Sequence, residues 1–223
     1  MIGPDSTDTV GAVTDTIGST AHETAAQVRV AAGIAIASFV LGGLTSYAQG
    51  LLPSDVRSFA NSASGWTLIT AGLVFWSRLP ARWAAPLGAA SFVFLVLGYT
   101  VVAEYRGFHY EPLMFSVIGL VVGPFIGTAA SWLRNSPLRA ALATALLAGV
   151  AVGEAAYGLT TVRETTSPVY WTAIGVVGIG LVTAALATRV RGAFPVGVAV
   201  VGTPLIACAF IVSFRALGGL GFA

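Results

Sequence analysis

The sequence predicts an all-α fold, a polytopic bundle of about seven transmembrane helices. Hydrophobic residues make up 56% of the 223-residue chain and charged residues only 9%, whereas a soluble domain is about 25% charged. Long uncharged runs recur along the chain from residue 30 onward, and prolines stand near the starts of several of them. So few charges could not cover a water-soluble fold, so we expect one domain with lipid as its main solvent.

The N-terminal residues 1–27 differ from the rest because they are polar and acidic. They lack the basic, apolar and cleavage regions of a secretory signal. Their Gly, Thr and Ser residues form helices weakly. We therefore expect 1–27 to be a polar tail that is disordered or marginally helical, and 28–223 to be the transmembrane helical domain.

The remaining chain divides into seven apolar segments of about 20 residues, the length that crosses a hydrocarbon core of roughly 30 Å. The predicted helices are 28–48, 56–77, 84–103, 112–133, 138–160, 168–188 and 194–214. Five prolines fall at or near helix starts, where their missing N–H costs nothing: Pro53, Pro112, Pro137, Pro168 and Pro195. Asp55 is placed to cap the second helix.

Arginine placement predicts a cytoplasmic N-terminus, because positive charge is retained on the cytoplasmic side. All eleven basic residues are arginine. Seven lie inside in this orientation (Arg29, Arg78, Arg82, Arg134, Arg139, Arg189 and Arg191) and four outside (Arg57, Arg106, Arg163 and Arg215). Six spans with an outer N-terminus give the same balance if 50–83 does not cross. We prefer seven, because the run WTLITAGLVFW at 66–76 is too apolar for a cytosolic loop.

Small residues recur every four positions in the fourth and fifth predicted helices. The fourth carries Gly119, Gly123 and Gly127, and the fifth carries a similar row that begins at Ala141. Such faces allow helix backbones to approach closely in a membrane. They predict packing within the chain, with a homo-oligomer or a membrane-protein partner on the Gly119/Gly123/Gly127 face as the alternative.

Polar side chains in unusual places indicate where chemistry could lie. A charge in the hydrocarbon costs about 2.5–3.5 kcal/mol on insertion scales, and Glu154 interrupts the fifth helix with Tyr157 on the same face. The second helix carries Arg57 and Asn61 near its start, the first helix ends with Gln49, and Arg106 lies in the following outer loop.

All six of these residues lie toward the outer half of a seven-span bundle. We therefore expect an outward-facing polar pocket for a small-molecule ligand, with Glu154 near its floor. A structural interpretation stays open beside it, in which Glu154 pairs with Arg57, Arg106 or Arg163.

Several functions are excluded by what the chain lacks. The absence of lysine excludes a retinal Schiff base and a P-loop. Two histidines and one cysteine, far apart, do not indicate a metal site, and no cofactor is expected. Because no basic run could follow a phosphate backbone, we expect no nucleic-acid partner.

Several phrases carry a family resemblance: QGLLP at 49–53, FANSASGW at 59–66, GYTVVAEYRG at 98–107, GPFIGTAASWLR at 123–134 and LAGVAVGEAAYGL at 147–159. The chain resembles, over about residues 38–190, an actinobacterial family of multi-pass membrane proteins known only as a domain of unknown function. The resemblance implies a membrane location and a helical fold, but no activity.

Three functions remain open for a multi-pass protein of the cell membrane. The first is a small-molecule transport or substrate-binding component, powered by a partner ATPase or an ion gradient because no nucleotide-binding motif is present. The second is a non-catalytic membrane subunit or assembly protein. An intramembrane enzyme is the least favoured, because its only candidate acid–base cluster, Glu104, His109 and Glu111, lies in a loop near water.

Overall fold

Helices joined by short turns make up the described chain. The computed structural model describes the backbone of residues 6–219 and the side chains of residues 23–217, and this part contains no strand. The elements are α1 (Ser6–Leu51), the 3-10 helix η1 (Arg57–Asn61), α2 (Ala63–Ser77), α3 (Ala81–Tyr105), α4 (Pro112–Trp132), α5 (Pro137–Thr160), α6 (Pro168–Thr188) and α7 (Ala193–Gly219). The predicted all-α bundle is confirmed.

Within the described residues, six helices have the length and apolar composition needed to cross a membrane. They are α1 from Glu23 onward and α3 to α7. Large aliphatic side chains cover their outer faces; Val176 and Leu205, for example, are 63% and 64% exposed. The exception is α2, because its 15 residues rise only about 22 Å, less than the roughly 30 Å of hydrocarbon.

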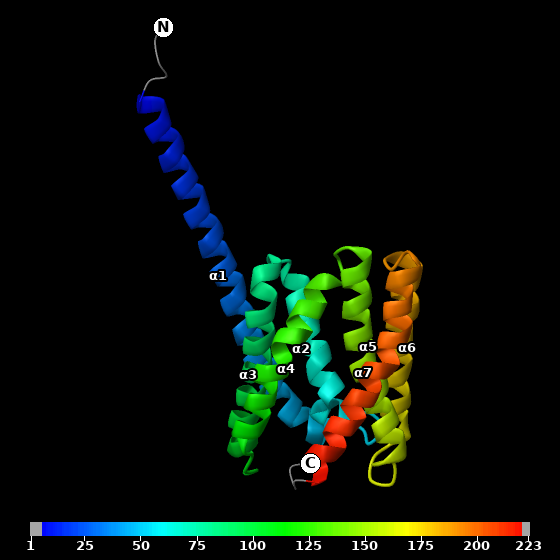
Figure 1. Cartoon of the computed structure of the whole chain (residues 1–223). Coiled ribbons are helices and arrows are strands. Elements are labelled where there is room, and N and C mark those ends of the chain that lie inside the picture. The colour runs from blue at the N-terminus through cyan, green and yellow to red at the C-terminus, as the bar shows by residue number, and fades with distance from the viewer. Residues whose placement is uncertain (1–5, 220–223) are drawn as a thin grey trace.

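The described part of the chain, residues 6–219, nevertheless passes between the two ends of the bundle seven times. At one end, Gln27 of α1 accepts hydrogen bonds from Arg82 and Trp83 at the start of α3. At the other end, Gln49 of α1 accepts from Tyr99 of α3 at 3.0 Å. Since α1 and α3 therefore run in the same direction, η1 and α2 must return the chain between them. The N-terminal end of α1 and the C-terminal end of α7 then lie at opposite ends of the bundle (Figure 1).

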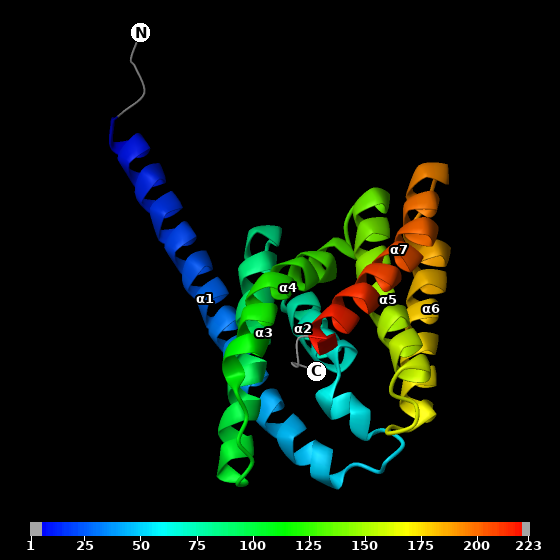
Figure 2. The ribbon, with the colours of Figure 1, turned by 60° about the horizontal axis from the view of Figure 1, so that its bottom comes forward.

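The predicted second helix over 56–77 is wrong in its details, because that passage is interrupted. The chain forms η1, becomes extended at Ser62 (φ −124°, ψ 149°), and begins α2 at Ala63. Asp55 does not cap this helix. Its carboxylate instead accepts a hydrogen bond from Ser167 at the start of α6, and Figure 2 shows the segment before α2 running beside the α5–α6 turn.

Small residues bring neighbouring helices into backbone contact. A Cβ at Gly127 of α4 would lie 2.0 Å from the Ala84 carbonyl oxygen of α3, and one at Gly88 would lie 2.1 Å from that of Gly123. In α5, Gly149 packs on Ile206 of α7. The small faces of α4 and α5 thus meet α3 and α7 rather than each other, and association with a second copy stays a prediction.

The N-terminal part of α1 continues the helix beyond the other helices (Figure 1). The backbone is helical from Ser6, while residues 1–5 and the side chains of 6–22 lie outside the described part. The expectation that 1–27 is a disordered tail concerns mainly these residues and stays a prediction.

Candidate functional site

The start of α2 forms a buried polar point inside the bundle. The first N–H groups of any α-helix have no partner within the helix, and here they lie among other helices rather than in water. The Ser62 hydroxyl accepts from Gly65 N at 2.9 Å, and Trp66 N donates to the Ser62 carbonyl at 3.2 Å. A side chain at Gly65 would meet the Phe59 carbonyl oxygen at 2.2 Å, so this turn requires glycine there.

Glu154 of α5 binds the two remaining N–H groups. Its Oε1 accepts from Ala63 N at 2.8 Å, and its Oε2 accepts from Ser64 N at 2.7 Å. The side chain is only 3% exposed. Because the N-terminus of a helix carries a partial positive charge, the α2 backbone supplies the compensation that a buried carboxylate needs. Backbone donors therefore hold Glu154, rather than an arginine as in the structural alternative.

The surrounding side chains fix this arrangement. The Tyr170 hydroxyl of α6 lies 2.5 Å from the Ser62 hydroxyl, and its ring packs against Phe59 and Trp171. Trp171 in turn lies against Gly158 of α5, where a Cβ would come within 2.1 Å of the indole. Helices α5 and α6 thus hold both the carboxylate and the cap of α2.

The polar sequence patterns do not identify Ser62 and Tyr170 as part of this site. A serine before an apolar helical run is an N-cap signal, and Ser62 precedes such a run, so the cap could have been found. Tyr170 gives no comparable signal, because it lies 108 residues away along the chain.

The six residues predicted to bind a ligand lie in separate places. Gln49 and Arg106 join α1 to α3, since Gln49 accepts from Tyr99 and Arg106 donates to both the carbonyl and the hydroxyl of Ser46. Arg57 and Asn61 are exposed. Tyr157 packs on Phe214 of α7 at 5.5 Å between ring centroids. Of the six, Glu154 is the one that binds the start of α2.

A mainly apolar cavity of about 220 Å³ lies beside this polar point. Ser64 stands in its wall, together with Thr67, Leu68, Ala71, Gly72, Phe75, Leu133, Leu147, Val150, Ala151, Val177, Gly178 and Leu181. The Ser64 Oγ is buried near the Glu154 carboxylate, but it makes no hydrogen bond of normal geometry. A second cavity, of about 450 Å³, lies at the other end of α2. Neither cavity is lined by any of the six predicted residues.

Six apolar helices of spanning length, with an interrupted helix held by a buried carboxylate, define a multi-pass membrane protein. The chain belongs to the family of unknown function DUF6518, whose model matches residues 21–219. The predicted resemblance to a domain of unknown function is thereby confirmed, over a longer stretch than expected. No characterised protein and no solved structure matches the chain.

Proposed function

We propose that the protein binds a small, mainly apolar molecule inside the bilayer and acts in its transport across the cell membrane. The observation that carries this proposal is the cavity beside Ser64. Its volume of about 220 Å³ is below the roughly 300–1,000 Å³ of drug-sized sites. The ligand is therefore small, or part of it extends into the lipid.

The wall of the cavity defines the chemistry of the ligand. Most of the lining is aliphatic, whereas Ser64 offers a hydroxyl that can both donate and accept. The Ser64 Oγ has almost no exposed surface, so a polar atom of the ligand reaches it only if this side chain rotates toward the cavity. Because a buried polar group without a partner costs about 1–3 kcal/mol, we expect this rotation when the ligand binds. Leu68 of α2 and Val177 of α6 line the cavity and are 44% and 48% exposed on the surface of the bundle. The ligand therefore has an entry route from the lipid between α2 and α6.

The interrupted helix favours transport over simple binding. In secondary transporters, discontinuous helices place their free ends at the substrate site near the middle of the membrane. Here Glu154 occupies the N-terminal end of such a helix and thereby holds Ser64, which lines the cavity. This comparison is an analogy of architecture. Transport would require an ion gradient or a partner ATPase.

Filling the cavity tests the proposal. A Cβ at Gly72 meets no atom within 4 Å, so Gly72→Leu adds a side chain to the cavity wall with little strain. Gly180 of α6 also has free space and is exposed, outside the cavity, so Gly180→Leu is the matched control. Small molecules extracted from the purified proteins are identified by mass spectrometry. We expect a compound that is retained by the wild type and by Gly180→Leu and lost from Gly72→Leu; equal recovery from all three contradicts the site.

The alternative function is a non-catalytic membrane subunit. It is favoured by the two backbone hydrogen bonds of Glu154, which account for a buried carboxylate without any ligand. Ser64→Ala separates the two functions, because that hydroxyl makes no hydrogen bond of normal geometry. If Ser64 binds the ligand, the Ser64→Ala protein should be nearly as stable as the wild type but retain less of the compound. If the protein has a purely structural role, the two proteins should not differ in retention.

A further inference from the structure

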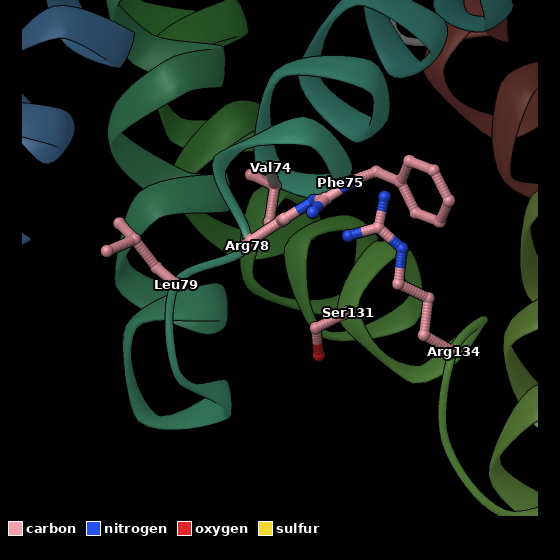
Figure 3. A pocket seen from close by; sticks show the side chains of 6 residues that line it. All are labelled: Val74, Phe75, Arg78, Leu79, Ser131 and Arg134. Carbon is pink, nitrogen blue, oxygen red and sulfur yellow. The ribbon is translucent and has the colours of Figure 1, made fainter.

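The larger cavity, which the proposed function does not use, lies where α2 and α4 end. Its volume is about 450 Å³, and it is lined by Val74, Phe75, Arg78, Leu79, Ser131 and Arg134. Figure 3 shows the guanidinium groups of Arg78 and Arg134 in the centre of this lining, beside the ring of Phe75. Two cationic side chains thus line this cavity.

The aromatic ring of Phe75 fixes one of these groups. The Cζ atom of Arg134 lies 3.5 Å from the centroid of this ring, a cation–π contact, and Arg134 is half-buried. A guanidinium held in one orientation presents its N–H fork to a ligand at a lower entropic cost than a free side chain. The retention of positive charge on the cytoplasmic side would explain why arginines occur in the turns after α2 and α4. It would not explain why two of them line one cavity.

The local charge calls for an anion. The turns 78–80, 133–136 and 189–192 at this end contain arginines and no acidic residue. Like charges held together in one cavity repel each other unless a counter-charge is present. Guanidinium groups bind phosphate oxygens through paired N–H donors. The Ser131 hydroxyl in the same lining already donates to the Thr128 carbonyl, so the two arginines supply the donors for the anion.

Tryptophans place the cavity at the level of lipid headgroups. Trp76 is 79% exposed next to the end of α2, and Trp132 and Trp83 are partly exposed at the ends of α4 and α3. Tryptophan concentrates at membrane–water interfaces, and basic pockets between transmembrane helices on the cytoplasmic side bind phosphorylated headgroups. We propose that Arg78 and Arg134 form a binding site for a phosphate group, carried by an anionic lipid or by a soluble anion.

Two measurements on the full-length protein distinguish the two sources. In the first, native mass spectrometry compares the retention of phosphatidylglycerol with that of diacylglycerol, which has no phosphate, for the wild type and for Arg78→Gln/Arg134→Gln. In the second, thermal unfolding in lipid-free detergent is followed with inorganic phosphate against chloride at equal ionic strength. Loss of charge-assisted hydrogen bonds predicts that the double variant loses about tenfold in affinity for its phosphate ligand.

The control is Arg191→Gln, which removes an exposed arginine at the same end but outside the cavity. Each single variant at Arg78 and Arg134 is measured as well, in case the double variant fails to fold. Selective loss of phosphatidylglycerol supports a lipid site, and selective loss of the shift caused by inorganic phosphate supports a soluble anion site. Unchanged responses in the variants, or an equal loss in Arg191→Gln, would overturn the proposal.

Discussion

At the scale of single residues, Glu154 determines how the second passage of the chain is built. A carboxylate inside a bilayer is costly, yet this one accepts from two N–H groups, of Ala63 and Ser64, that would otherwise lack partners. The carboxylate and the two N–H groups therefore each lower the cost of burying the other. This exchange explains why α2 can begin inside the bundle.

Replacement of Glu154 by Gln should destabilise the protein by about 1–3 kcal/mol, because the neutral amide keeps one acceptor and turns a donor toward a backbone N–H. The unfolding temperature in detergent measures this loss. Glu164→Gln, at an exposed acid in the α5–α6 turn, should be neutral. Equal unfolding temperatures for both variants would show that the carboxylate does not hold α2.

Replacement of Tyr170 by Phe should have a smaller effect, about 1 kcal/mol, because it removes one hydroxyl partner of Ser62 and keeps the buried ring. Tyr105→Phe is the control, since Tyr105 is 86% exposed. Chemical unfolding of the two variants measures the difference. A Tyr170→Phe protein as stable as the wild type contradicts a role for this hydroxyl in the cap.

At the scale of helices, small residues determine which pairs pack closely. Apolar length was sufficient to predict most helix bounds; the predicted 112–133 and 138–160 correspond to Pro112–Trp132 and Pro137–Thr160. The partners of each helix could not be predicted, because several helices carry similar small faces. The break at Ser62 was also missed, since a change in one residue's backbone angles leaves the average hydropathy unchanged.

Replacement of Gly127 by Leu should separate α3 from α4 and lower stability strongly, because even a Cβ would overlap the Ala84 carbonyl oxygen. Gly33→Leu on α1 is the matched control, since a Cβ there meets nothing within 4 Å and leucine favours helices over glycine. The yield of folded protein by size-exclusion chromatography compares them. Similar yields would contradict the packing of α3 on α4.

At the scale of the whole molecule, the polar residues predicted to bind a ligand were chosen by one criterion, polarity near the outer end, but they do not form one site. Arg106 and Gln49 are polar residues near the predicted outer end. In the structure, each forms a hydrogen bond that connects α1 with α3 or with the residue that follows it. Polarity alone does not say whether a side chain meets a ligand or another helix. Glu154 was recognised because of its burial cost, but its backbone partners lie some 90 residues away along the chain.

The whole site depends on the topology, because the polar point at the start of α2 exists only if η1 and α2 cross the bundle. Reporters fused separately to the N-terminus and the C-terminus, each active on only one side of the membrane, test it directly. Seven passages predict termini on opposite sides of the membrane. The placement of the arginines predicts that the N-terminus is the one in the cytoplasm. Termini on the same side would contradict the interrupted passage, and with it the site that Glu154 holds.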